Sequence, residues 1–169
     1  FSYYSINLIR RIHMRKYIPH ILIISFIFLL VPTAHVASHA GELEDAKEKV
    51  RIDPDDAWAH NDLGIVYGRL GKHEEEIESF KQAIRLDPDN AAAHFNLGYA
   101  YGMLGKYEEE IEACKQAIRI YPDFASAHLN LGVAYLFLND RGSALEQYKI
   151  LKKLDTEKAN KLFNEIYSE

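Results

Sequence analysis

Three histidines recur at a spacing of 34 residues, at His60, His94 and His128. Imidazole is a common ligand of zinc and other transition metals, so a shared metal site is the first chemistry to consider. The residues around each histidine have helical spacing, and neighbouring helices pack with axes about 8–10 Å apart. Zinc needs each nitrogen at about 2.0–2.1 Å, so equivalent positions of successive helices cannot converge on one ion. We therefore expect these histidines to pack between helices, and we expect no metal site.

The remaining polar motifs give no better case for catalysis. His73 and Glu74–Glu76 resemble the start of the zinc-protease motif, but the second histidine four residues on is absent. His35 and His39 have an i, i+4 spacing, yet they fall inside a predicted leader. The sequence has no Gly-x-Ser-x-Gly, no phosphate-binding loop and no dinucleotide-binding glycine pattern. We predict that the protein is not an enzyme and uses no cofactor, and that its glutamate triplets open helices in water.

The charges divide the chain into two unlike parts. Residues 1–40 hold four cations and no acidic residue, whereas all 25 acidic residues and the other 16 lysines and arginines come later. Residues 41–169 are therefore more negative than the whole chain, whose formal net charge is −5. Such a domain repels phosphate and has no basic stripe that could release counterions. Nucleic acid is excluded as a partner.

The elements that carry these residues repeat every 34 positions. Residues 57–90 align with residues 91–124 at 22 of 34 identical positions, and residues 125–158 form a looser third copy. A period of this length indicates a small structural unit stacked on copies of itself. Arrays of this kind offer surfaces for binding rather than catalytic centres.

Each copy has the pattern of two helices joined by a short turn. In the first copy Asp55 or Asp56 can cap the first helix, and Gly71 ends it. Glu74–Glu76 open the second helix, where negative charge meets the positive end of the helix dipole, and Pro88 follows its end. Glycines recur inside the first helix, at Gly64, Gly98 and Gly132, where each costs about 1 kcal/mol relative to alanine. We interpret them as points where the second helix approaches the first closely.

These residues carry a resemblance to the tetratricopeptide repeat. The matching residues are Leu63, Gly64, Tyr67, Phe80, Ala83 and Pro88 in the first copy, Leu97, Gly98, Tyr101, Ala117 and Pro122 in the second, and Leu131, Gly132, Tyr135, Ala144 and Tyr148 in the third. The resemblance implies an all-α fold, a right-handed superhelical stack of helix-turn-helix repeats with flanking capping helices. Glu76 and Glu110 depart from it, because they fill a slot where the family usually has a small residue. Leu151 and Thr156 replace the alanine and proline of the third copy, as expected of an end repeat.

The repeats set the expected boundaries along the chain. They are 1–40 for a leader, 41–56 for an N-terminal capping half-repeat, 57–90, 91–124 and 125–158 for the three repeats, and 159–169 for a C-terminal capping helix. Ala159, Leu162, Phe163, Ile166 and Tyr167 give that last helix an amphipathic stripe. Cys114, the single cysteine, takes the slot of Phe80 and Tyr148, so we expect it to be buried and unreactive.

The leader has the layout of an export signal that starts at Met14. Arg15 and Lys16 precede an apolar run over residues 21–31, Pro32 ends the run, and Ser38 and Ala40 place small residues at a cleavage site. We predict cleavage after Ala40 and a periplasmic or extracellular location. The alternative is a membrane anchor over residues 18–36, although a spanning helix needs about 20 apolar residues. Residues 1–13 are either upstream sequence read into the frame or a long polar start to the leader.

The resemblance also implies a binding surface, because the inner wall of such stacks is lined mainly by the first helix of each repeat. The predicted surface residues are Trp58, Asn61, Ile65, Arg69, Phe95, Tyr99, Met103, Leu129, Val133 and Phe137, with Ala92 and Ser126 at equivalent slots. The set is rich in the aromatic and apolar types that anchor interfaces, so we expect an extended peptide or an amphipathic helix there.

We predict a non-catalytic scaffold or adaptor that binds a protein or peptide. One family subclass binds a terminal carboxylate through a Lys, Asn and Arg clamp, but here the slots hold Asn61, Ile65, Tyr99, Ser126 and Asn130. That function is rejected, because most of the required residues are missing. Two alternatives remain: a self-associating module, in which the apolar wall meets a second copy, and a membrane-tethered adaptor that keeps its leader.

Overall fold

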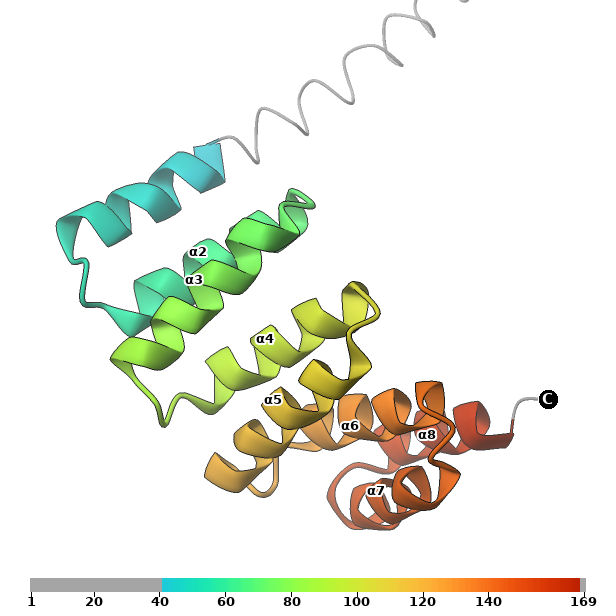
Figure 1. The fold of residues 1–169 in the computed structure, drawn as a ribbon. Helices are drawn as coiled ribbons and strands as arrows, with labels where there is room; N and C mark the ends of the chain where they lie inside the picture. The colour runs from blue at the N-terminus through green and yellow to red at the C-terminus, as the bar shows by residue number, and fades with distance from the viewer. Residues whose placement is uncertain (1–40, 168–169) are drawn as a thin grey trace, which may run out of the picture. The chain divides into compact units, whose positions relative to one another are not determined.

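The computed structural model describes residues 41–167, and the predictions about the leader lie outside them. The chain divides into a unit up to Glu42 and a unit that begins at Leu43, and the second unit is entirely helical. Its helices pack in chain order as successive antiparallel pairs (Figure 1). The predicted all-α stack of helix pairs is confirmed.

The helices alternate between the first and second members of each pair. Their bounds are α2 Ala57–Arg69, α3 His73–Leu86, α4 Ala91–Met103, α5 Tyr107–Ile120, α6 Ala125–Phe137, α7 Arg141–Leu154 and α8 Thr156–Tyr167. Residues 41–52 are also helical and come before α2. Lys49 of this segment lies 3.3 Å from Asp62 of α2, and Ala46 is buried. A helix without a first partner therefore precedes the three repeats.

The turn inside each repeat requires a left-handed backbone. Gly71 and Gly105 have φ angles of 68° and 70°, and Asn139 takes the same position in the third repeat with φ 60°. Glycine has no steric penalty there, and asparagine is among the side chains that tolerate this region best. The start of α2 is capped by Asp56, whose carboxylate accepts a hydrogen bond from the Trp58 amide at 2.8 Å.

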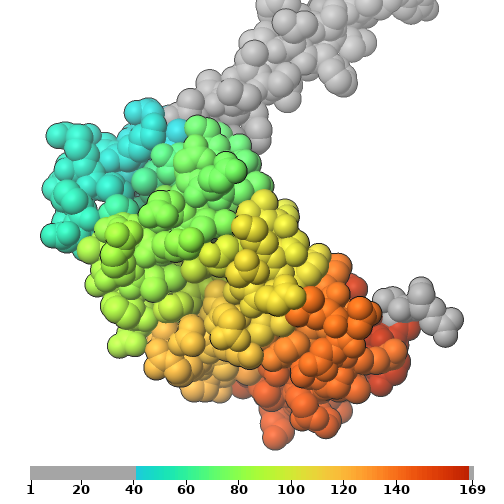
Figure 2. Space-filling model, in the orientation of Figure 1, coloured from blue at the N-terminus to red at the C-terminus, as the bar shows by residue number. Residues whose placement is uncertain are grey.

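The core consists of small clusters that join neighbouring helices. Phe80, Leu97, Ala100 and Ala113 form one cluster, Ile111, Cys114, Leu131 and Ala134 the next, and Ala144, Leu151, Ala159, Leu162 and Ile166 the last. Each cluster connects helices that follow one another in the chain. Stability therefore comes from contacts between neighbouring repeats, as in other linear arrays. The space-filling view shows the same succession of helix pairs packed against each other (Figure 2).

The glycines inside the first helices mark close contacts, but the contacting group differs between repeats. A Cβ placed on Gly64 would lie 2.6 Å from the ring of Phe80. One on Gly98 would lie 3.0 Å from Cys114 Sγ and 3.3 Å from the Glu110 carbonyl oxygen. The backbones therefore approach as predicted in the second repeat, whereas a large ring fills the space in the first. In the third repeat the nearest atoms to a Cβ on Gly132 belong to Leu162 of α8, and Gln147 Cβ of its own second helix follows at 3.3 Å.

Two glutamates are buried between helices because glycines make room for them. A Cβ on Gly68 would lie 2.5 Å from Glu76 Oε1, and one on Gly102 would lie 2.5 Å from Glu110 Oε2. Both glutamates are buried, although the resemblance places a small residue in their slot. The third repeat reverses the sizes, because Leu136 takes the glycine position and packs against the cluster that contains the buried Ala144. In each repeat, one of the two paired positions holds a large side chain and the other a small one.

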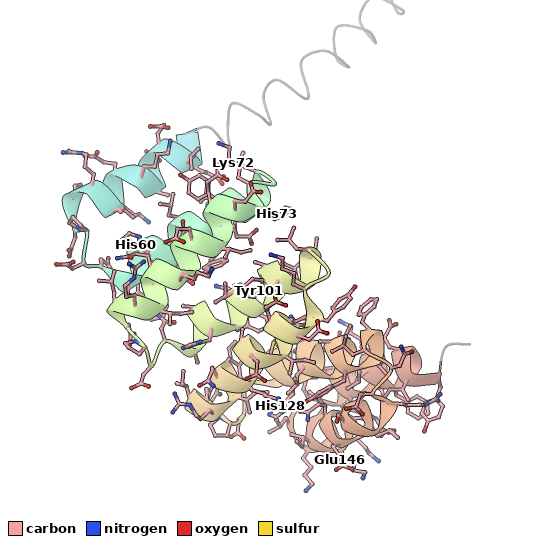
Figure 3. The ribbon with its side chains drawn as sticks, viewed as in Figure 1. His60, Lys72, His73, Tyr101, His128 and Glu146 are labelled. Atoms are coloured by element: carbon pink, nitrogen blue, oxygen red, sulfur yellow. The ribbon has the colours of Figure 1, made fainter. Side chains whose placement is uncertain are left out.

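The two buried glutamates differ in their partners. Glu76 Oε2 lies 2.8 Å from His73 Nδ1, which precedes it by one helical turn in α3 (Figure 3). Tyr107 takes the place of that histidine in the second repeat, and burial raises the pKa of Glu110 from 4.5 to about 7. Burial of the Cys114 thiol raises its pKa to about 12, and the nearby charge of Glu110 contributes to the increase. Cys114 is fully buried, so the prediction that it is buried is confirmed. Its burial and raised pKa both favour the unreactive thiol form.

The C-terminal helix begins earlier than predicted and buries less of its stripe. It starts at Thr156 rather than at residue 159. Ala159, Leu162 and Ile166 are buried, whereas Phe163 and Tyr167 remain exposed and contact each other in a tilted arrangement with ring centroids 4.5 Å apart. The cause is geometric: a helix docked on one side buries a narrow stripe, and residues at its edge meet solvent.

We predict that the size exchange between α4 and α5 can be transplanted. Gly102→Leu alone should clash with the Glu110 carboxylate and destabilise the fold by about 1–3 kcal/mol, the usual cost of overpacking. Adding Glu110→Ala should recover much of the loss, because it recreates the Leu136–Ala144 pairing of the third repeat. Urea unfolding of the two single variants and the double variant measures the coupling energy. Additive effects would contradict the proposed complementarity.

We also predict that Glu110 makes the stability pH-dependent. Its folded pKa of about 7 exceeds the ordinary value of 4.5, so the folded chain keeps the proton over a range where the unfolded chain has released it. The stabilisation is complete below pH about 4.5 and is lost as the pH rises through about 7. The loss is at most about 3 kcal/mol, reduced by solvent screening.

Glu110→Gln should remove this part of the pH dependence and raise the free energy of unfolding at pH 8. The matched control is Glu76→Gln, which exchanges a charge-assisted bond with His73 for a neutral one and should lower stability. Urea unfolding at pH 5 and pH 8 checks both variants. If the free energy of unfolding of Glu110→Gln changed with pH as much as that of the unaltered chain, the prediction would be contradicted.

Candidate protein-binding surface

The first helices of the three repeats expose four large apolar side chains. Trp58, Tyr99, Met103 and Phe137 leave 60, 52, 61 and 59% of their surfaces in solvent. They lie on α2, α4 and α6, and all four belong to the predicted surface set. We call these four residues the first-helix face. Exposed apolar side chains of this size are the types that anchor interfaces when a partner covers them.

Other predicted surface residues contribute to packing between repeats. Ile65 is half-buried against the Phe80 cluster, and Leu129 and Val133 are half-buried against the Ala144 cluster. Their side chains support neighbouring helices and present only an edge to the surface. Arg69 is exposed at the end of α2.

Asn61 does not line an open surface. It is 4% exposed, and its Oδ1 accepts a hydrogen bond of 2.9 Å from Asn96 Nδ2 on α4. This bond joins the first helices of adjacent repeats and uses the polar group that a ligand would need. Assigning Asn61 to the surface was therefore wrong, because a slot defined by position alone does not reveal a polar partner one repeat away.

Aromatic neighbours extend the surface beyond the predicted set. Tyr107 of α5 stacks on Phe137 with ring centroids 4.3 Å apart and an interplanar angle of 2°. Phe95 is half-buried and tilts against Phe124 at 4.9 Å, and Phe124 in turn contacts Tyr121 at 5.8 Å. The sequence signal for these neighbours was an aromatic residue where the preceding copy has His73, Asp87 or Asn90. That signal was missed.

The recurring histidines tie each repeat to the preceding turn. His60 Nε2 donates to the Pro54 carbonyl at 2.9 Å, His94 Nε2 to Pro88 at 3.0 Å, and His128 Nε2 to Pro122 at 2.9 Å. A carbonyl can only accept, so Nε2 carries the proton in each case. His60 and His128, labelled in Figure 3, lie on α2 and α6. Besides the packing expected from the sequence, each histidine therefore forms a hydrogen bond to the carbonyl of the proline six residues before it.

A metal site and a membrane span are two further features that residues 41–167 could carry. In this range no three His, Cys, Asp or Glu side chains are grouped closely enough to hold a metal ion. None of the helices in that part of the chain has the length and apolar character needed to cross a membrane.

Stacked helix pairs define a helical-repeat protein, and sequence comparison identifies the repeat. Residues 69–105 match a model described as a TPR repeat, and residues 91–124 match the tetratricopeptide repeat. The chain therefore carries tetratricopeptide repeats, and these models describe repeats rather than catalytic domains. No significant match is found among curated protein sequences.

Solved structures show the same fold. A crystal structure of MamA is 29% identical, with a TM-score of 0.65 over 70% of this chain and 69% of that one. A second MamA crystal structure is 27% identical, with a TM-score of 0.66 over 75% and 69%. The second TPR domain of human RPAP3, solved in complex with the HSP70 peptide SGPTIEEVD, is 28% identical, with a TM-score of 0.63 over 66% and 94%.

We predict that the histidines act without metal. His94→Ala should lower the free energy of unfolding by about 1 kcal/mol, because it removes the bond to the Pro88 carbonyl. Addition of zinc should leave the melting temperature of the unaltered chain unchanged. A rise in melting temperature with zinc that disappears in His94→Ala would contradict this reading.

Proposed function

We propose that this protein is a non-catalytic scaffold that binds a peptide or helix of a partner protein on its first-helix face. The observation that carries the proposal is the exposure of Trp58, Tyr99, Met103 and Phe137 on consecutive first helices. Burying one such side chain contributes roughly 1.5–3 kcal/mol, so a partner that covers several of them gains favourable binding free energy. The peptide complex of the RPAP3 domain supports the use of this fold for peptide binding.

The chemistry of the face favours an apolar partner segment. The slots that would hold a cationic clamp for a terminal carboxylate contain Ile65, Tyr99 and Ser126 among others, so the face lacks those charges. Asn61 is already bonded to Asn96. An amphipathic helix, or a strand with alternating apolar side chains, suits such a surface better than an acidic tail.

The proposed place of action is outside the cytoplasm. The support is the cationic start, the apolar run and the small residues before Gly41 in the predicted leader. Cleavage after Ala40 would release residues 41–169 to the periplasm or the exterior, and retention would make the protein a membrane-tethered adaptor. N-terminal sequencing of the exported protein distinguishes the two.

The binding proposal is tested with Tyr99→Ala/Met103→Ala in the full chain. Both side chains are exposed, so their removal should reduce partner capture by at least tenfold while the helical circular dichroism is kept. Phe95 is less suitable for replacement, because it packs on Phe124. The matched control is Ile52→Ala/Tyr167→Ala, which removes two exposed apolar side chains outside the face. Trp58, the single tryptophan, reports occupancy through its fluorescence.

The outcomes separate the alternatives. Equal capture by the Tyr99→Ala/Met103→Ala variant and the unaltered chain would contradict the proposal. The molar mass in solution could instead rise with protein concentration, and the Tyr99→Ala/Met103→Ala variant could abolish that rise. This result would show that the first-helix face binds a second copy of the chain. Light scattering over a range of concentrations makes that measurement.

A further inference from the structure

A hollow lies on a different side of the repeats from the first-helix face. It has a volume of about 490 Å³ and opens between α3, α4 and α5. Successive side chains on a helix are about 100° apart, so Leu97 and Tyr101 point about 160° away from Tyr99. Tyr101 is labelled on α4 in Figure 3. A ligand in this hollow would therefore leave the first-helix face free.

The floor of the hollow is apolar. Leu97 and Ala113 are buried members of the Phe80 cluster, and Ile84 and Tyr101 pack against that cluster while remaining partly exposed. A floor of this kind can bury one large apolar side chain without breaking an existing polar contact.

Comparison with the next repeat explains why the hollow is open here. The counterparts of His94 and Ala113, 34 residues on, are His128 and Gln147, and Gln147 Oε1 lies 2.8 Å from His128 Nδ1. Ala113 and Gln147 lie at the same distance from the first helix of their repeats. A Cβ placed on Gly98 would lie 3.3 Å from Ala113 Cβ, and one placed on Gly132 would lie 3.3 Å from Gln147 Cβ. A glutamine side chain thus reaches the histidine in one interface, and an alanine leaves the equivalent space empty in the other.

One wall of the hollow is acidic. Glu108, Glu109 and Glu112 of α5 line it, and Lys81 of α3 lies on the opposite side. Glu112 is paired with Lys115 at 3.0 Å, whereas neither Glu108 nor Glu109 has an ion pair among residues 41–167. Their counterparts in the third repeat are uncharged, Gly142 and Ser143. Negative charge therefore exceeds positive charge at this opening.

We propose that the hollow is a second docking site, for a partner-protein segment with an aromatic or large aliphatic anchor flanked by lysine or arginine. The anchor would lie on Leu97 and Tyr101, and the flanking cations would pair with Glu108 and Glu109. A chain segment fits the opening because the acidic wall belongs to α5 and most of the apolar floor to α3 and α4, so an extended ligand can contact both. The proposal does not depend on the first-helix face.

The test is a titration of the full chain with acetyl-Lys-Phe-Lys-amide, followed by the amide NMR signals of Leu97 and Ala113. Saturable shifts are expected at millimolar peptide. Ala113→Gln should weaken binding by at least tenfold, because it transplants the residue that fills the same slot in the third repeat. Glu108→Gln/Glu109→Gln should weaken it several-fold, and added salt should have the same effect. Tyr99→Ala/Met103→Ala should bind the peptide normally.

Matched ligands and a folding control complete the experiment. Acetyl-Glu-Phe-Glu-amide and acetyl-Lys-Ala-Lys-amide should bind much more weakly, since each lacks one of the two required features. Unchanged helical circular dichroism in Ala113→Gln shows that a loss of binding is not a loss of fold. The proposal is overturned by the absence of saturable shifts, by unchanged binding in Ala113→Gln, or by equal binding of the glutamate peptide. Equal binding of phenethylamine would also overturn it, because it would indicate a small-amine site.

Discussion

The close contact at the glycine in the middle of each first helix is the constraint on which the rest of the stack depends. A Cβ at Gly64 would overlap the ring of Phe80, and one at Gly132 would overlap Leu162. Each glycine thus lets a neighbouring helix bring a side chain against the backbone. The helix pairs can then seal clusters as small as four buried residues, such as Phe80 with Leu97, Ala100 and Ala113. Because every cluster joins consecutive helices, each repeat depends on the next one for its burial.

Only some positions of each first helix are needed for packing, so the other positions can form surfaces. The packing of α4 uses Ala93, Leu97, Gly98 and Ala100, all of which are buried. Tyr99 and Met103 lie on the same helix and take no part in that burial, since more than half of each remains in solvent. No helix within residues 41–167 covers the exposed apolar surface of these two side chains. Binding to another protein gives that exposure a physical reason.

The sequence was sufficient for the frame because the frame is periodic. Gly71, the glutamate triplet and Pro88 of the first copy recur in the second, so the helix pairs, their turns and the buried slot of Cys114 could be predicted. The start of α8, which follows the last copy, could not. The surface was harder to predict, because exposure depends on contacts between repeats. Asn61 is buried, and Asn96, 35 residues on, donates the hydrogen bond that satisfies its amide oxygen. Glu110 is buried because Gly102 opposes it, and that relation is visible only when the two helices are placed side by side.

The position that opens each second helix shows how one frame yields different surfaces. His73 bonds to Glu76 within its own helix, at 2.8 Å. Tyr107, at the same position one repeat on, instead stacks on Phe137 of the following repeat. Arg141, at that position again, lies 4.8 Å from the ring centroid of Tyr167. The backbone at these sites is the same, so each residue changes local charge and shape without changing the helices that hold it. In such an array, single substitutions at this position can therefore change the surface of one repeat and leave the buried clusters intact.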